Sequence, residues 1–416
     1  MKLTGPEILH LILAITGLGF LLEQVLDYLN LRYLREDLPA ELAGIYNEAE
    51  YRKSILYQKV QARFGFITSL AGFLVSFSML AFGGFGYLDE MLKPLVSHDI
   101  LRSLAFFGSL FIAADLLTLP FQLYSTFRLE ERFGFNNTTP RTFIIDKLKG
   151  YFLALLVGGS ILYLLLYLIQ TLGRDFWWVF WVAITGFSII TNVFYTSLIL
   201  PLFNKLTPLE EGALKSAITD YAKKVNFPLG SILIIDGSKR SNKSNAFFSG
   251  LGRQKKVVLY DTLVEKHTTE ELVSVLAHEV GHYKKRHILV GLLLSVIQTG
   301  LMLYLMQYVI FNEQLAVALG GEGLAMHLNL IAFAILYGPF STILGLLTNI
   351  MSRRNEYAAD AFAAATYQGS SLQSALKKLS VHNLSNLMPH PWYVFFNYSH
   401  PPLLQRLKAI DRIQNL

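Results

Sequence analysis

A five-residue segment, His278-Glu279-Val280-Gly281-His282, has residue types and spacing that suit metal-dependent hydrolysis. Residues four apart lie on one face of an α-helix, so the imidazoles of His278 and His282 can both reach one Zn²⁺ at about 2.0–2.1 Å. Glu279 then lies beside the ion and can take a proton from the attacking water. The segment predicts one zinc ion per chain, with His278 and His282 as ligands and Glu279 as general base.

A third ligand is expected farther along the chain, because catalytic zinc has three protein ligands and one open position. The candidate is Glu356, in the segment Asn355-Glu356-Tyr357-Ala358-Ala359-Asp360. Asp360 lies one helical turn later on the same face and could accept the second ring N–H of a ligating histidine, which would fix its tautomer. The spacing alone leaves open that both carboxylates belong to a solvated acidic face.

The elements that must position these residues are a helix and a small sheet. A helix is predicted over Thr269–Lys285, with Thr269 as its N-cap and two glutamates in its first turn. Apolar runs predict strands at Ser231–Asp236 and Lys256–Tyr260. An edge strand is expected at Asn245–Ser249, between them in the chain.

The remainder of the chain is too apolar for a soluble globule. Of the 416 residues, 53% are hydrophobic and 16% are charged, against about 25% charged residues in ordinary soluble domains. A helix needs about 20 apolar residues to cross a bilayer. Seven runs are long enough: Ile8–Leu29, Phe64–Tyr87, Ser103–Leu123, Tyr151–Leu172, Phe176–Leu202, Ile288–Phe311 and Leu328–Ile350. These features predict a polytopic membrane protein and exclude intrinsic disorder.

Basic residues suggest an orientation for these spans. Outside one long polar segment that carries 14 of the Lys and Arg residues, 18 lie on one side of the predicted membrane and 4 on the other. Since basic loops stay in the cytosol, we expect the N-terminus outside and the C-terminus inside. We attribute the net charge of +6 to these loops and expect no nucleic-acid partner. The absence of cysteine excludes disulfides and thiolate chemistry.

The pattern divides the chain into four parts. Both polar parts lie on the same predicted side of the membrane and can pack together as one bipartite cytosolic domain. The parts are residues 1–202 with spans one to five, 203–287 with the histidine motif, 288–350 with spans six and seven, and 351–416, which completes the zinc site. Polar residues within the spans, such as Glu23, Asp115 and Asn192, are expected to face a bundle interior or a cavity, or to bond between helices.

Three blocks together resemble the type I CAAX prenyl protease family, which are seven-span zinc metallopeptidases: HEVGH, SRRNEYAAD at 352–360 and SHPPLLQR at 399–406. Two further blocks are similar to the family, LPFQLYSTFRLEERFGFNNTTP at 119–140 and SNAFFSG at 244–250. The resemblance therefore covers nearly the whole chain. The related HtpX-type proteases share the zinc residues but have fewer spans and lack the FGFN block.

The resemblance implies roles for individual residues. His278, His282 and Glu356 match the family's zinc ligands, and Glu279 matches its general base. Three further matches are Asn245, beside an edge strand that binds substrate, and His400 and Arg406, which face the cleft and could stabilise an oxyanion. His287 follows a basic run expected to anchor the membrane interface, and receives no role.

The fold class expected is a seven-helix membrane bundle that encloses a chamber, with a cytosolic α+β metalloprotease domain. The expected activity is zinc-dependent hydrolysis of C-terminal CAAX peptides of prenylated proteins, so the partners are a protein or peptide substrate and the lipid bilayer. Two alternatives stay open: an HtpX-like quality-control protease, and a transporter or scaffold. A bacterial inner membrane is favoured over the endoplasmic reticulum.

Overall fold

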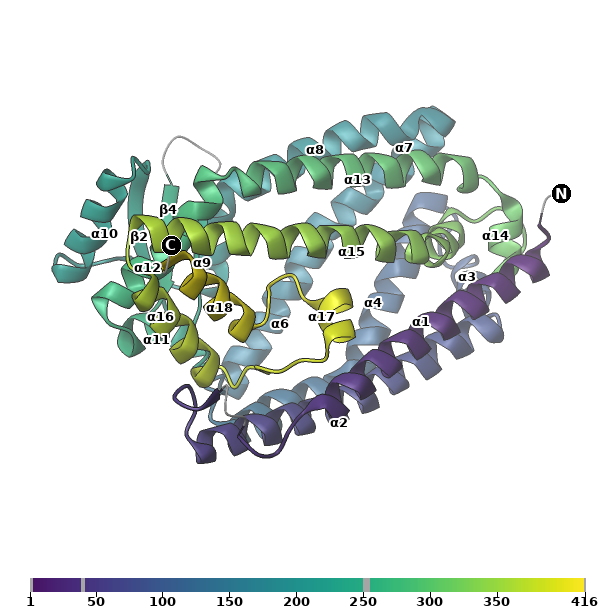
Figure 1. Cartoon of the computed structure of the whole chain (residues 1–416). Coiled ribbons are helices and arrows are strands. Elements are labelled where there is room, and N and C mark those ends of the chain that lie inside the picture. The colour runs from purple at the N-terminus through teal and green to yellow at the C-terminus, as the bar shows by residue number, and fades with distance from the viewer. Residues whose placement is uncertain (1–2, 39–41, 250–254, 415–416) are drawn as a thin grey trace.

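The computed structural model describes residues 3–38, 42–249 and 255–414 of the chain. Gly250, the last residue of the SNAFFSG block, lies outside this part. Long helices extend from a smaller domain at one end of the molecule, and the N-terminus lies at the opposite end (Figure 1). The long apolar helices are α1 (Gly5–Tyr33), α2 (Glu48–Ala81), α4 (Asp99–Tyr124), α7 (Gly159–Leu172), α8 (Phe176–Phe194), α13 (His287–Val309) and α15 (Met326–Thr366).

These helices form a ring. Together with α3 (Gly84–Leu92), neighbours in contact run from α1 through α2, α3, α4, α7, α8, α13 and α15, and α15 returns to α1. Only 6–17% of the residues in their most apolar stretches are buried, although helices in a solid bundle would each bury one face. The helices therefore enclose a chamber, and the predicted fold class is confirmed.

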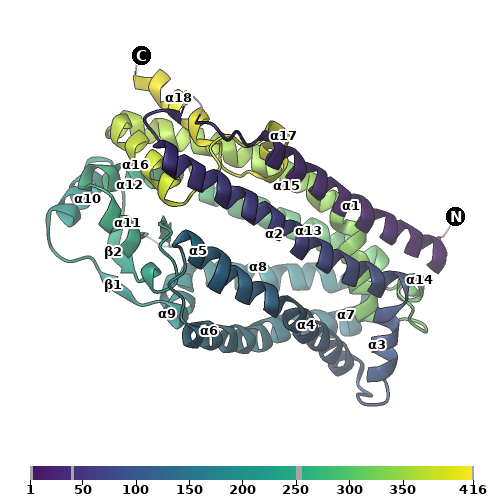
Figure 2. The same ribbon diagram turned by 90° about the horizontal axis from the view of Figure 1, so that it is seen from below.

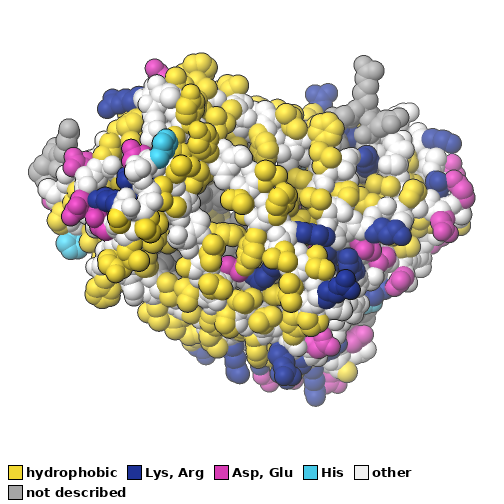
Figure 3. Space-filling view, turned by 180° about the vertical axis from the view of Figure 1, so that it is seen from behind, with side chains coloured by type: hydrophobic (Ala, Val, Ile, Leu, Met, Phe, Trp, Pro, Cys, Tyr) yellow, Lys and Arg dark blue, Asp and Glu magenta, His cyan; other side chains and the backbone are white. Residues whose placement is uncertain are grey.

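The surface of the ring is apolar, as expected for helices that face lipid. A broad band of hydrophobic side chains crosses the rear face, and charged side chains gather at the two ends of the molecule, many of them over the small domain (Figure 3). Six stretches among the described residues are long and apolar enough to cross a membrane. One of them, Pro140–Phe203, has 64 residues, and within it the chain turns at Gly173–Asp175, where Gly173 has a φ of +56°. One predicted span, Tyr151–Leu172, precedes that turn, and another, Phe176–Leu202, follows it.

The second predicted span extends past the end of its helix. We expected Phe64–Tyr87, but α2 begins at Glu48 and ends at Ala81, after which Gly83 has a φ of +66°. Glycine adopts this left-handed backbone at little cost, so the chain turns there into α3. The apolar run continues across the break, and hydrophobicity alone gives no sign of it.

The small domain lies at the end of the ring opposite the N-terminus (Figure 2). Its four-stranded sheet has the order β1 (Leu206–Pro208), β2 (Leu229–Ile235), β4 (Lys255–Tyr260) and β3 (Ala246–Ser249). β2 and β4 are parallel, whereas β1 and β3 pair antiparallel to them at the two edges. The three predicted strands are confirmed, and β1 was not predicted.

One helix, α12 (Thr269–Lys284), packs at the centre of this domain, close to the predicted bounds. Its N-cap is Thr268 and not Thr269. The Thr268 hydroxyl accepts a hydrogen bond from the Glu271 N–H, and the Glu271 carboxylate accepts one from the Thr268 N–H. Five apolar residues of α12 are at most 2% exposed. The shorter helices are α5 (Glu131–Phe133), α6 (Pro140–Leu153), α9 (Leu200–Phe203), α10 (Ala213–Lys224), α11 (Asp261–Lys266), α14 (Glu313–Ala318), α16 (Gly369–His382), α17 (Pro391–Asn397) and α18 (Leu403–Gln414).

The hydrophobic core around α12 draws on both polar parts of the chain. It contains residues of α10, β2, β4 and α12 together with Leu372, Leu403 and Ile410 from the C-terminal part. Residues from the loop between α1 and α2, such as Leu42 and Tyr46, complete it. Segments more than 300 residues apart therefore share one core.

Candidate active site

The closest approach of α12 to α15 brings the predicted metal ligands together. A Cβ at Gly281 would lie 2.9 Å from Cα and 3.1 Å from the carbonyl oxygen of Ala359, closer than side chains normally approach backbone. Gly281 lies between the two histidines of α12, and Ala359 lies one turn after Glu356 on α15. Glycine at this position lets the two helices cross where all three ligands face each other.

The three candidate ligands present one atom each to a common point. Nε2 of His278 and Nε2 of His282 are 3.2 Å apart. The carboxylate of Glu356 lies 3.3 Å from Nε2 of His282 and 3.5 Å from Nε2 of His278. Donors about 2.0–2.1 Å from a tetrahedral ion are about 3.3 Å apart. Oε2 of Glu356 is buried and accepts no hydrogen bond within the described part of the chain. The donor set therefore fits a tetrahedral metal ion.

Behind the ligands, Asp360 and Arg406 hold His278. Nδ1 of His278 is 2.8 Å from Oδ1 of Asp360, as expected for a partner that fixes the tautomer. Arg406, from α18, donates from Nε and Nη2 to the two oxygens of Asp360 at 2.8 and 2.6 Å. Nη1 of Arg406 lies 3.5 Å from Glu356. Asp360 is fully buried and Arg406 is 9% exposed, so this fork neutralises a buried carboxylate.

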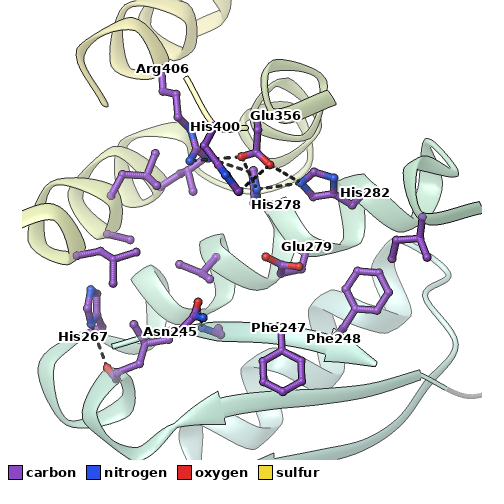
Figure 4. Close-up of a pocket in the computed structure, with 18 residues that line it drawn as sticks. Asn245, Phe247, Phe248, His267, His278, Glu279, His282, Glu356, His400 and Arg406 are labelled. Carbon is purple, nitrogen blue, oxygen red and sulfur yellow. Dashed lines mark hydrogen bonds and ion pairs between the residues drawn. The ribbon is translucent and has the colours of Figure 1, made fainter. Parts of the chain in front are cut away.

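Glu279 is placed beside the ligands and below them in Figure 4, facing β3. Burial raises the pKa of Glu279, and the nearby imidazoles of His278 and His282 oppose this rise. For His278 the balance is reversed. Burial disfavours its charged form, but contacts with Asp360 and Glu356 raise the pKa of His278 to about 9. The carboxylates therefore create a field that favours a cation at the ligand set.

A cavity of about 380 Å³ lies in front of the ligands. Nε2 of His400 is 3.3 Å from Glu356, and the His400 side chain is exposed. One wall is apolar and comes mainly from α16 and α12: Val275, Leu372, Ala375, Leu376 and Leu379. The opposite wall is the strand β3, with Asn245 just before it (Figure 4). All the predicted site residues except Asp360 line this cavity.

The strand β3 is held at its start and free along one edge. Among the described residues it pairs with β4 alone. Just before it, the side chain of Asn383 pairs with the backbone of Ser244: Oδ1 accepts from the Ser244 N–H at 3.2 Å, and Nδ2 donates to its carbonyl at 3.3 Å. The sequence contains no signal for this contact, because 139 residues separate its partners.

The sequence analysis gave His287 no role, but the structure brings its ring into contact with a candidate ligand. Nδ1 of His287 lies 3.1 Å from Nδ1 of the candidate ligand His282, and the rings meet edge to face with centroids 5.1 Å apart. The signal was available, since a third histidine follows His282 by five residues. The basic run between them drew the interpretation toward the membrane interface.

Comparisons with known proteins agree with this geometry. Residues 27–205 match the family model described as CAAX prenyl protease N-terminal, five membrane helices, and residues 208–414 match peptidase family M48. The CAAX prenyl protease 1 homolog of Oryza sativa is 33% identical over 97% of both chains. The chain belongs to the CAAX prenyl protease family. CAAX prenyl protease 1 of Saccharomyces cerevisiae is 34% identical, over 95% of this chain and 93% of its own.

The fold agrees as closely. The crystal structure of S. mikatae Ste24p superposes with a TM-score of 0.92 at 33% identity, and the match covers 97% of this chain and 99% of that one. The protein is thus an integral-membrane metallopeptidase with a peptide or protein substrate. This membership decides against the transporter or scaffold.

Proposed function

We propose that this protein is a zinc endopeptidase that removes C-terminal peptides from CAAX-type, prenylated proteins. The observation that carries the proposal is the meeting of His278, His282 and Glu356 at one point. Glu279 lies on the side of this cluster that faces the edge strand β3. The relatives from rice and yeast, which are named as CAAX prenyl proteases, support the substrate class.

His278, His282 and Glu356 would hold the zinc ion. When bound, it would polarise the scissile carbonyl and lower the pKa of a water molecule in the open position. Glu279 takes the proton of the attacking water and passes it to the leaving amine. The raised pKa of Glu279 suits both steps, because a carboxylate that binds its proton more strongly is a better base and can still return the proton.

His400 and Arg406 have different parts in this proposal. The exposed His400 lies at the cavity surface, where it can donate to the oxyanion of the tetrahedral intermediate. Arg406 is buried, and two of its nitrogens already bind Asp360. We therefore assign the oxyanion to His400, and to Arg406 the orientation of Asp360 and through it of His278.

Substrate binding is proposed along β3. Asn245 and the free edge of β3 can bind a peptide backbone as an added strand, which demands little of the substrate sequence. The apolar wall opposite, formed by Val275 and residues of α16, suits the two aliphatic residues at the centre of a CAAX motif. Selectivity would then come from side-chain size and polarity on that wall.

The membrane arrangement proposed has seven spans, with the N-terminus outside and the C-terminus cytosolic. It counts the 64-residue stretch Pro140–Phe203 as two spans that turn at Gly173. The proposed division into residues 1–202, 203–287, 288–350 and 351–416 is kept, and a shared core supports the joining of the second and fourth parts in one domain, to which the first part adds Leu42 and Tyr46. A bacterial inner membrane stays the favoured location, with the endoplasmic reticulum as the alternative.

The test is cleavage of a farnesylated CAAX peptide by the purified full-length protein, with metal content measured in parallel. Wild type should carry about one zinc per chain and cleave the peptide. Glu279→Gln should retain the zinc and lose at least about 100-fold in kcat, the lower range for a missing general base. His98→Phe, at an exposed position that caps α4, is the control and should match wild type.

Each alternative outcome has a definite meaning. Zinc without cleavage of the farnesylated peptide, combined with cleavage of unfolded membrane proteins, would favour an HtpX-like quality-control protease. Wild type without stoichiometric zinc would refute the proposed cofactor. Full activity of Glu279→Gln would refute the proposed base.

A further inference from the structure

The two histidines proposed as ligands have unequal surroundings. Both present Nε2 to the common ligand point, so each has Nδ1 left to bond elsewhere. Nδ1 of His278 meets the carboxylate of Asp360 at 2.8 Å. Nδ1 of His282 meets no carboxylate in the described residues, but instead the Nδ1 of a third imidazole, that of His287, at 3.1 Å.

A histidine that binds metal through Nε2 carries its proton on Nδ1, and that N–H needs an acceptor. Nδ1 of a neutral imidazole can accept only if that ring carries its own proton on Nε2. We propose that His287, in this tautomer, accepts a hydrogen bond from Nδ1–H of His282 and is a positioning residue for this ligand. The inference rests on the proposed zinc site of the preceding section.

The backbone at the corner between α12 and α13 makes this contact possible. α12 ends at Lys284, and Arg286 adopts a left-handed conformation with φ 60° and ψ 24°. Residues with a Cβ adopt this conformation uncommonly. The turn lets His287, the first residue of α13, approach a residue only five positions earlier. A continuous helix would place residues five apart on different faces.

The chemistry of the partner also matters. A carboxylate next to His282 would add a further buried negative charge to a site that already contains Glu279, Glu356 and Asp360. Asp360 is compensated by the fork of Arg406, and the described residues place no second arginine there. A neutral imidazole orients His282 without adding charge. The arrangement therefore gives each ligand histidine a partner for Nδ1 and adds no carboxylate beyond the one that Arg406 binds.

The test compares zinc affinity in His287→Phe and His287→Gln, measured by competition with a chromophoric chelator on purified full-length protein. Phenylalanine keeps a planar ring and cannot accept. The side-chain carbonyl of glutamine can. We expect His287→Phe to bind zinc about 10- to 100-fold more weakly, the usual loss when such a partner is removed. His287→Gln should stay within about threefold of wild type, because an amide oxygen accepts N–H as imidazole does.

Controls separate folding from binding. The metal-free variants are compared by thermal unfolding and gel filtration, and His98→Phe is the matched control. If His287→Phe does not fold, the smaller His287→Leu, which also cannot accept, takes its place. Co²⁺-loaded protein gives a second readout, since loss of ligand orientation should change its visible absorption in the phenylalanine or leucine variant but not in the glutamine variant.

Wild-type zinc affinity in His287→Phe would overturn the inference. Equal losses in the phenylalanine and glutamine variants would overturn it too, because they would point to packing and not to an accepted hydrogen bond. Absence of zinc from the wild type would instead refute the proposed zinc site, so the two failures are distinguishable.

Discussion

Replacement of Gly281 by alanine should distort the metal site, although it changes none of the three candidate ligands. The new Cβ would lie 2.9 Å from Cα of Ala359, and ordinary contact begins at 3.4 Å, so α12 and α15 must separate by about 0.5 Å. Ligand distances in metal sites tolerate about 0.2 Å. The displacement exceeds that tolerance, and overpacking of this kind costs about 1–3 kcal/mol of stability.

We therefore expect Gly281→Ala to bind zinc at least about tenfold more weakly and to lose peptidase activity in proportion. Zinc affinity is measured by chelator competition, and stability by thermal unfolding in detergent. Gly345→Ala is the matched control, because Gly345 lies on α15 with open space where its Cβ would be. Wild-type zinc affinity and kcat/KM in Gly281→Ala would refute the claim that this crossing positions the ligands.

Two further predictions concern neighbours of the site. In Asn383→Asp a carboxylate oxygen replaces the amide that donates to Ser244 at the start of β3. Loss of this bond, worth about 1–2 kcal/mol, should raise KM about 5- to 30-fold with a smaller change in kcat; an unchanged KM would contradict a role of Asn383 in presenting the strand. Burial opposes ionisation of Glu271, but bonds from Lys378, Ser374 and Thr268 outweigh it and lower the pKa of Glu271. Its stabilisation is therefore complete above the unfolded-state pKa of about 4.3 and is lost as pH falls through the lower folded-state pKa. The thermal unfolding temperature of Glu271→Gln should depend less on pH below about 4.5 than that of wild type, and parallel curves would contradict this.

The parts of the site that follow a local pattern were predictable. His278, Glu279 and His282 lie within five residues of one helix, and short apolar runs identified β2 and β4 as strands. Glu356 needed the resemblance to a family, because it lies 74 positions after His282 and two predicted membrane spans come between them. Spacing alone could not distinguish a ligand from a solvated acid at that distance.

The contacts that sequence analysis missed depend on backbone conformations or on tertiary approach. His287 reaches His282 only because Arg286, a residue with a Cβ, takes a left-handed conformation. Asn383 reaches Ser244 only because α16 packs across the domain. For the same reason the break after α2 was missed, since the apolar run continues through Gly83. Such features carry no periodicity of their own.

The site cannot be separated from the membrane helices that surround the chamber. α15 is one helix of 41 residues whose first part is apolar and whose last turns carry Glu356 and Asp360. α13 begins with His287, directly after the helix that carries His278 and His282. Two helices of the ring therefore carry site residues near their ends at the small domain: α15 carries the candidate ligand Glu356, and α13 carries His287, which contacts His282. A change in the spacing of α13 and α15 would move Glu356 relative to the histidines, so the geometry of the ring and the affinity for metal must be coupled. The helices that enclose the chamber thus also help to set the distances between Glu356 and the two histidines of the candidate metal site.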